Sequence, residues 1–241
     1  MNPRDTMTRQ VRAVLERETR INLHRFPIRI DSAEDVVTLE GEVADIAAKK
    51  LALEAVAGVE GVGGVIDRLR VAPGERRGDG AIRDSVARRL LEAAEFRNCT
   101  IQTYTNERIE RLRGGNGDSV GDIQVSVTEG VIVLEGKVQS QPHRLFAGVL
   151  AWWTPGRLDV LNALEVVPRY EERDDEITET LRLVLEADPL VDASQINPVC
   201  ERWVATLEGT VPTEEQRRRA ELDAWYLSGV HRVNNNLQVA R

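Results

Sequence analysis

A short alternating segment occurs three times in this chain, and this repetition limits the folds that the chain can adopt more than any other feature. The copies are Val37–Val43, Ile132–Val138 and Ala205–Val211, and each has the form apolar-x-Leu-Glu-Gly-x-Val. Alternation of apolar and polar residues around a fixed glycine predicts a half-buried β-strand with a bend at the glycine. A repeated unit of this kind determines the domain organisation, so it has to be defined first.

Two glycines recur at a constant separation in each copy, which sets the register of the repeat. The first glycine is Gly41, Gly136 or Gly209, and the second follows 20 residues later as Gly61, Gly156 or Gly229. A further apolar pattern follows each second glycine and predicts a last strand that opens at this glycine. We interpret these six glycines as structural positions of the repeat.

Helical patterns complete each unit. Residues at four-residue spacing predict a first helix; they are Met7, Val11 and Leu15, then Ile82, Val86 and Leu90, then Ile177, Leu181 and Leu185. A helix N-cap residue, Asp45, Ser140 or Thr213, follows each first glycine by four residues. Each unit is therefore predicted to run helix, strand, strand, helix, strand. The expected fold class is α+β, with each small mixed sheet covered by two helices on one face.

This arrangement resembles the BON domain, the module named for bacterial osmotic-stress and nodulation proteins. The resemblance rests on the Val-x-Leu-x-Gly-x-Val strand, the capped helix and a Gly-Val-x-x-Val-x-x-x-Leu-x-Val ending, in three copies over nearly the whole chain. Two positions depart from the pattern. Arg157 stands where an apolar residue is expected, and Pro198 removes a ladder donor, which indicates an edge or bulged strand.

The units are expected at residues 1–73, 81–168 and 174–241, with a polar, glycine-rich linker after the first. The second unit is longer than the others because about 20 additional residues separate its first helix from its first repeat strand. This insertion lies near residues 99–121. A long insertion in a small domain is typically either functional or disordered, and the sequence leaves a loose hairpin, disorder and a binding role open.

The charge of the chain limits its partners. The net charge is −8 and the isoelectric point is near 5.1, which argues against a nucleic-acid binder held by general electrostatics. The N-terminal residues Met1–Glu18 contain no apolar run of signal-peptide length, and no stretch of the chain approaches the length of a transmembrane helix. The simplest expectation is a soluble cytoplasmic protein, whereas the BON resemblance implies a periplasmic location as the alternative.

The residues that usually carry catalysis are scattered. His24, His143 and His231 lie in three different units, and Cys99 and Cys200 do not have the spacing of a metal or redox motif. No nucleophile–base arrangement is recognisable. We therefore expect a protein that is not an enzyme, with no catalytic residue, no metal site and no cofactor.

Large apolar side chains near the end of the second helix form the candidate interaction surface. It consists of Phe146, Leu150, Trp152, Trp153, Trp225 and Tyr226. Adjacent helical residues point about 100° apart, so one member of each aromatic pair should lie outside the core of its own unit. The open alternatives are packing between units, contact with another protein chain, which includes a homo-oligomer, and insertion at a membrane surface. On the corresponding helix of the third unit, the triplet Arg217–Arg219 is interpreted as a solvated face or an anion contact.

The resemblance implies a binding role linked to osmotic or envelope stress, with a protein partner or a phospholipid membrane surface as the target. The alternative is a sensor of potassium or of a small ligand, which would bind through backbone carbonyls at the glycine turns.

Overall fold

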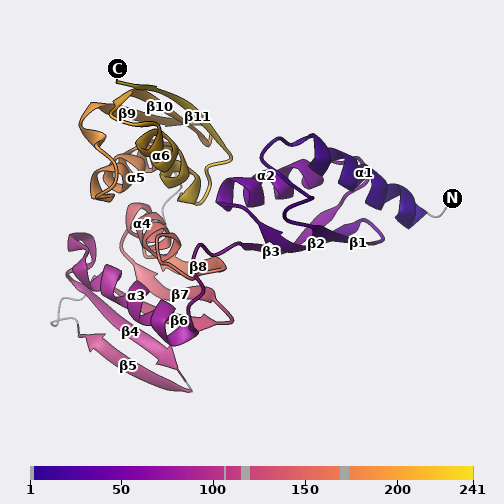
Figure 1. Ribbon diagram of the computed structural model, residues 1–241. Helices are drawn as coiled ribbons and strands as arrows, with labels where there is room; N and C mark the ends of the chain where they lie inside the picture. The colour runs from indigo at the N-terminus through magenta and orange to yellow at the C-terminus, as the bar shows by residue number, and fades with distance from the viewer. Residues whose placement is uncertain (1–2, 106, 115–119, 169–173, 241) are drawn as a thin grey trace. The chain divides into compact units, whose positions relative to one another are not determined.

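The computed structural model describes residues 3–105, 107–114, 120–168 and 174–240 (Figure 1). Its contacts divide the chain into two compact units, Met1–Ala72 and Pro73–Arg241. The first unit holds one helix–strand–strand–helix–strand repeat, and the second unit holds two. The fold class expected from the sequence is confirmed.

The three repeats use the same order of elements. Repeat 1 contains α1 (Pro3–Arg17), β1 (Ile28–Ala33), β2 (Val36–Val43), α2 (Ile46–Ala57) and β3 (Gly64–Val71). Repeat 2 contains α3 (Asp79–Glu92), the 3₁₀ turn Ala94–Phe96, β4 (Cys99–Thr105), β5 (Arg108–Arg113), β6 (Gly121–Thr128), β7 (Val131–Val138), α4 (Gln141–Trp152) and β8 (Asp159–Val166). Repeat 3 contains α5 (Asp174–Ala187), the 3₁₀ turn Ala193–Gln195, β9 (Ile196–Glu201), β10 (Val204–Val211), α6 (Glu214–Tyr226) and β11 (Arg232–Val239).

The central strand of each sheet carries the segment that the sequence repeats. Strands β2, β7 and β10 each pair antiparallel with the preceding strand and parallel with the strand that follows the second helix. A parallel pair needs a crossover connection, and α2, α4 or α6 provides it. The strand orders are β1-β2-β3, β5-β4-β6-β7-β8 and β9-β10-β11.

The first glycine of each repeat occupies one equivalent place in the sheet. Gly41, Gly136 and Gly209 pair with an isoleucine on one side and a leucine on the other; the pairs are Ile28 and Leu69, Ile123 and Leu164, and Ile196 and Leu237. All three glycines have a positive φ of 121–146°. A Cβ atom at Gly209 would lie 1.9 Å from the carbonyl oxygen of Gln195. Only glycine therefore allows the two strands to approach so closely at this point.

The second glycine does not open the last strand, so that detail of the sequence prediction is wrong by three residues. Gly61, Gly156 and Gly229 have φ values of 88°, 89° and 92° and lie in the turn before the strand. The strands begin at Gly64, Asp159 and Arg232. The left-handed backbone at the second glycine turns the chain from the helix toward the sheet, which explains its fixed spacing.

The insertion in repeat 2 adds strands to the sheet. Strand β4 pairs parallel with β6, and β5 pairs antiparallel with β4, so the sheet extends beyond the strand that corresponds to β1 and β9. The guanidinium of Arg113 holds the end of β5, because it donates to the carbonyl oxygens of Leu91 and Cys99 at 3.1 and 3.3 Å and to that of Phe96. The parts of the expected insertion at residue 106 and at 115–119 lie outside the described residues.

The predicted helix starts are confirmed at Asp45 and Thr213, whose side chains accept hydrogen bonds from the backbone N–H groups of Ala48 and Gln216. Ser140 occupies the same N-cap position, but its hydroxyl bonds to Nδ1 of His143 at 2.7 Å. A half-buried histidine ring thus takes the place of the backbone donor in repeat 2. None of the helices among the described residues combines the length and apolarity that a bilayer crossing requires.

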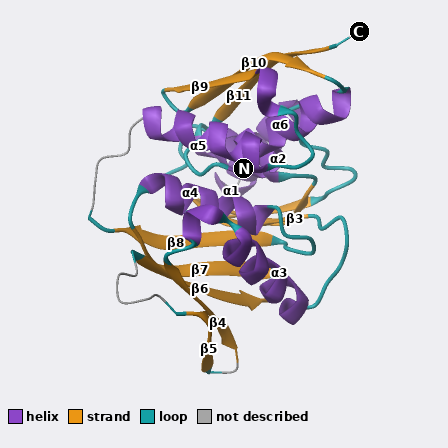
Figure 2. Ribbon diagram, turned by 90° about the vertical axis from the view of Figure 1, so that its left-hand side faces the viewer, coloured by secondary structure: helices purple, strands orange, loops and turns teal. Residues whose placement is uncertain are grey.

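Within the unit formed by residues 73–241, helices from the two repeats face each other between two sheets (Figure 2). Helix α4 of repeat 2 contacts both α5 and α6 of repeat 3. Each of these sheets is covered by helices on one face only and leaves its other face without a helix in that unit. The helix-to-helix contact and the uncovered sheet faces are the two places where function can be sought.

Candidate functional site

The aromatic residues that the sequence singled out meet where repeat 2 contacts repeat 3. The ring of Trp152, at the end of α4, stacks on Tyr226 of α6 with centroids 5.9 Å apart and an angle of 15° between the planes. The indole N–H of Trp153 donates to Oδ1 of Asp223 at 2.9 Å. Both tryptophans of repeat 2 therefore contact repeat 3. We call this region, with Trp152, Trp153, Asp223 and Tyr226 at its centre, the repeat junction.

The other members of the candidate surface are buried beside the junction. Phe146 stacks on Phe96 of its own repeat at 6.0 Å, and Leu150 and Trp225 are buried. These side chains pack into the helical layers and leave little of their area for a further partner.

A buried group of charged side chains completes the repeat junction, and the sequence analysis did not identify it. Asp188, which follows α5, and Asp223 of α6 are both almost fully buried. The Nε atom of Arg219 lies 2.5 Å from Oδ2 of Asp188 and 3.8 Å from Oδ1 of Asp223. The guanidinium of Arg219 also lies over the ring of Trp153, 5.9 Å from its centroid. Arg219 thus connects two carboxyl groups of repeat 3 to an indole of repeat 2.

The surroundings of Asp223 favour the protonated form of its carboxyl group. Burial, followed by the negative charge of Asp188, raises the pKa of Asp223 to about 8, although Arg219 opposes this shift. Two neighbouring buried carboxyl groups cannot both ionise at low cost. Near neutral pH the proton therefore stays on Asp223, and Arg219 pairs with the carboxyl group of Asp188.

This shift predicts that stability depends on pH. The unfolded chain loses the Asp223 proton near the ordinary pKa of 3.8, whereas the folded chain keeps it up to about pH 8. Between these values the folded state binds more protons, so the free energy of unfolding contributed by this group falls as pH rises. Urea unfolding of the full chain and of an Asp223→Asn variant at pH 5 and pH 8 measures this contribution.

The variant should lose less stability than the wild type between the two pH values, because a neutral amide replaces the titrating group. Equal losses in the two proteins would show that Asp223 does not hold its proton in the folded state.

A small cavity opens beside the repeat junction. Its volume is about 260 Å³. Its walls are formed by Trp152, Trp153, Arg157, Arg219 and Tyr226, together with the turn that ends at Gly156 and the linker residues Gly74 and Glu75. The cavity therefore combines aromatic faces with two guanidinium groups.

The uncovered sheet faces form the second candidate region. At the third residue of the last strand, repeats 1 and 2 expose an aliphatic side chain; Ile66 is 46% exposed and Leu161 is 58% exposed. They pair with Thr38 and Val133 on the central strands, whose neighbours along the chain are buried on the helix side. Repeat 3 has Asn234 at this place.

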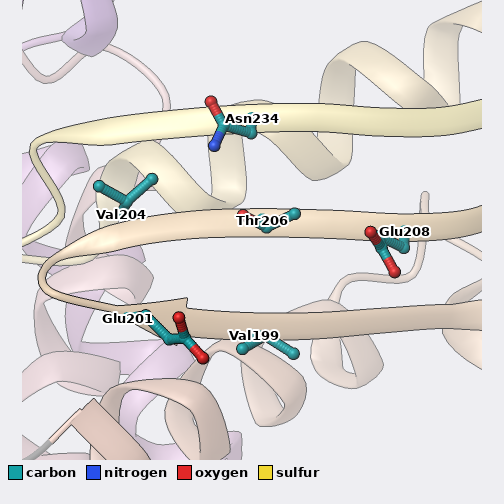
Figure 3. A pocket seen from close by; sticks show the side chains of 6 residues that line it. All are labelled: Val199, Glu201, Val204, Thr206, Glu208 and Asn234. Carbon is teal, nitrogen blue, oxygen red and sulfur yellow. The ribbon is translucent and has the colours of Figure 1, made fainter.

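In repeat 3 the same face of the sheet carries a shallow depression, where repeats 1 and 2 expose an aliphatic side chain. The depression, of about 380 Å³, lies over β9, β10 and β11 and is lined by Val199, Glu201, Val204, Thr206, Glu208 and Asn234 (Figure 3). The labelled side chains spread over all three strands, and the two carboxylates lie toward opposite ends of the row. The faces of the three repeats thus share a position in the fold but differ in shape.

The histidines and cysteines stay apart in the structure. His143 bonds to Ser140, and His24 and His231 are exposed, each in its own repeat. Cys99 and Cys200 are both buried, and they are not joined in a disulfide. Within the described parts of the chain, no three His, Cys, Asp or Glu side chains are placed to share a metal ion.

A family model of the BON domain matches residues 4–73, 106–168 and 173–241. The chain belongs to the BON domain family. Its second match begins within the insertion, so α3 and β4 of the second BON repeat lie outside the match. The structure nevertheless places α3 as the first helix of that repeat, like α1 and α5 in the other two.

Two solved structures of CdsD, a structural protein of the type III secretion system of Chlamydia trachomatis, align over most of the chain. The C-terminal domain of CdsD has 15% identity and a TM-score of 0.26, with 97% of this chain and 96% of that chain covered. The other structure has 16% identity and a TM-score of 0.24, with 98% and 94% covered. A search of curated proteins gave no match. At these scores the likeness to CdsD supports no conclusion about the BON repeats of this chain.

Proposed function

We propose that this BON protein is a non-enzymatic binding protein whose uncovered sheet faces dock a partner protein, in a role linked to osmotic or envelope stress. The observation that carries the proposal is the exposed aliphatic residue at one equivalent place, Ile66 in repeat 1 and Leu161 in repeat 2. A single exposed apolar residue is ordinary on a protein surface, so it is the recurrence at one equivalent place in two repeats that indicates an interaction site. Membership of the BON family supports the binding role.

The charges on these faces favour a protein over a phospholipid surface. In repeats 2 and 3 the central strand places an exposed glutamate, Glu135 or Glu208, beside this position, whereas Glu40 of repeat 1 lies 3.9 Å from Arg29. The negative surface potential of an anionic membrane repels such carboxylates. The net charge of −8 acts in the same direction. A partner surface with apolar and basic residues is complementary to this face.

Backbone hydrogen bonds at the turns give less support to the ion-sensor alternative. The carbonyl oxygens of Asp35, Gly130 and Trp203, in the hairpin turns, accept hydrogen bonds from the N–H groups two residues after the second glycine of each repeat. These carbonyls already join the turn to the last strand in all three repeats. Docking through the sheet faces is the function that the geometry favours.

Site-specific photo-crosslinking tests the proposal. A photoreactive amino acid at position 161 should give a discrete protein adduct in the source cell, and the same residue at position 190 should not. Leu190 is the matched control, because it is 64% exposed but lies in the turn after α5. A Glu135→Lys change in the chain that carries the crosslinker should weaken the adduct, since it reverses a charge beside Leu161.

Vesicle flotation distinguishes the membrane alternative. The full chain should stay with the soluble fraction in the presence of phosphatidylglycerol vesicles. Flotation that is lost in a Leu161→Glu variant, without a protein adduct from position 161, would show that the face binds lipid and would contradict the proposal.

A further inference from the structure

Arg157 is the residue of the second repeat that departs most clearly from the repeated pattern. The positions that follow the second glycine in the other repeats hold Val62 and Val230. Val230 is buried, as expected for an apolar residue at this turn. In repeat 2 a cationic side chain stands at the same point, at the wall of the cavity beside the repeat junction.

The contacts of Arg157 leave part of its guanidinium without a partner. The group lies over Trp152, 5.6 Å from the ring centroid. Its Nε atom is buried and has no hydrogen-bond partner among the described residues. A buried donor without a partner costs free energy, so the guanidinium is held over the indole ring at that cost.

The other charges around the cavity are already paired. Arg219 is bonded to Asp188 at 2.5 Å, and the carboxylate of Glu75 lies 2.9 Å from the guanidinium of Arg77. Asp223 is protonated near neutral pH, because burial and Asp188 raise its pKa to about 8. The positive charge of Arg157 is therefore the one that the walls of the cavity leave without a carboxylate among the described residues.

We propose that the cavity at the repeat junction binds a small organic anion, whose carboxylate pairs with the guanidinium of Arg157 and whose apolar body lies against the indole rings. A guanidinium recognises carboxylates well because its donors are planar and permanently charged. The volume of about 260 Å³ limits the ligand to a molecule smaller than those held by most drug-sized pockets of about 300–1,000 Å³. This site is distinct from the uncovered sheet faces, so the test of ligand binding is independent of the test of partner docking.

Calorimetric titration of the full chain with benzoate tests this site, since benzoate combines one carboxylate with a flat apolar body. Benzylamine, which has a similar shape and the opposite charge, is the control ligand. Benzoate should bind at millimolar concentration and should shift the indole N–H resonances of Trp152 and Trp153. Benzylamine should do neither, because Arg157 repels it.

Arg157→Val is the decisive variant, because it installs the residue that the other repeats carry and so should fold. Its affinity for benzoate should be about tenfold lower or more, because a charge-assisted hydrogen bond is lost. Arg218→Gln removes an exposed arginine of the neighbouring helix, with a side chain 77% exposed, and should leave the affinity unchanged. Absence of benzoate binding to the wild type, equal affinity in Arg157→Val, or equal binding of benzylamine would each overturn the proposal.

Discussion

Replacement of Gly209 by alanine should lower the free energy of unfolding of the full chain by about 3 kcal/mol or more. Two costs combine. The backbone has a φ of 123°, which a residue with a side chain rarely adopts, and the new Cβ atom would lie 1.9 Å from the carbonyl oxygen of Gln195. The clash involves backbone rather than a flexible side chain, so β9 and β10 would have to separate. Urea unfolding followed by circular dichroism measures the loss.

Gly80→Ala is the matched control for this change. Gly80 lies in the first turn of α3, its φ is not positive, and a Cβ atom there would meet nothing within 4 Å. Alanine favours helix over glycine, so the control should be neutral or stabilising by up to about 1 kcal/mol. Similar losses for the two variants would mean that the glycine of the repeated strand is not a special position.

The second large effect should follow from Arg219→Met. Methionine keeps an apolar chain against Trp153 but removes the charge, so the carboxylate of Asp188 stays buried without its guanidinium partner. Removal of one partner from a buried ion pair typically costs about 3–5 kcal/mol. The side chain of Arg219 is 28% exposed, so we expect a loss at the lower end of that range, about 3 kcal/mol.

A second substitution identifies the cause of that loss. The double variant Arg219→Met with Asp188→Asn has no buried charge to compensate and should recover part of the stability. Arg218→Met, on the exposed side of the same helix, should change the free energy of unfolding by less than about 0.5 kcal/mol. If the double variant were as unstable as the sum of its single changes, the ion pair would not be the source of the effect.

The repeat could be predicted from the sequence because its signals are local. An alternating strand around Gly41, Gly136 or Gly209 and a four-residue helical period are both visible within a dozen residues, and the structure confirms their register. The edge position predicted from Pro198 is also confirmed, since β9 lies at the border of its sheet. The start of the last strand was less predictable, because a glycine with positive φ can end a helix or begin a strand, and the local pattern does not distinguish the two.

The charged part of the repeat junction could not be predicted in the same way. Asp188 and Asp223 are ordinary helix-end and helix-surface residues in the sequence, and their burial depends on contacts between residues 31 or more positions apart. Arg219 belongs to the triplet Arg217–Arg219, in which Arg218 does lie on the solvated face of the helix. Likewise, the sequence left a loose hairpin as one alternative for the insertion near residues 99–121, but the parallel pairing of β4 with β6 is set by the three-dimensional arrangement.

The added strands of repeat 2 have a consequence for how the chain reaches its native state. Tandem copies of one fold can misassemble when a strand of one copy pairs with the sheet of its neighbour during synthesis. In repeat 1 one border of the sheet is β1. In repeat 2 the equivalent strand, β6, is covered by β4 and β5. In repeat 3 the equivalent strand, β9, carries Pro198, which lacks a ladder donor. Three nearly equivalent sheets therefore present three different borders to a newly made strand, and such differences disfavour pairing between repeats.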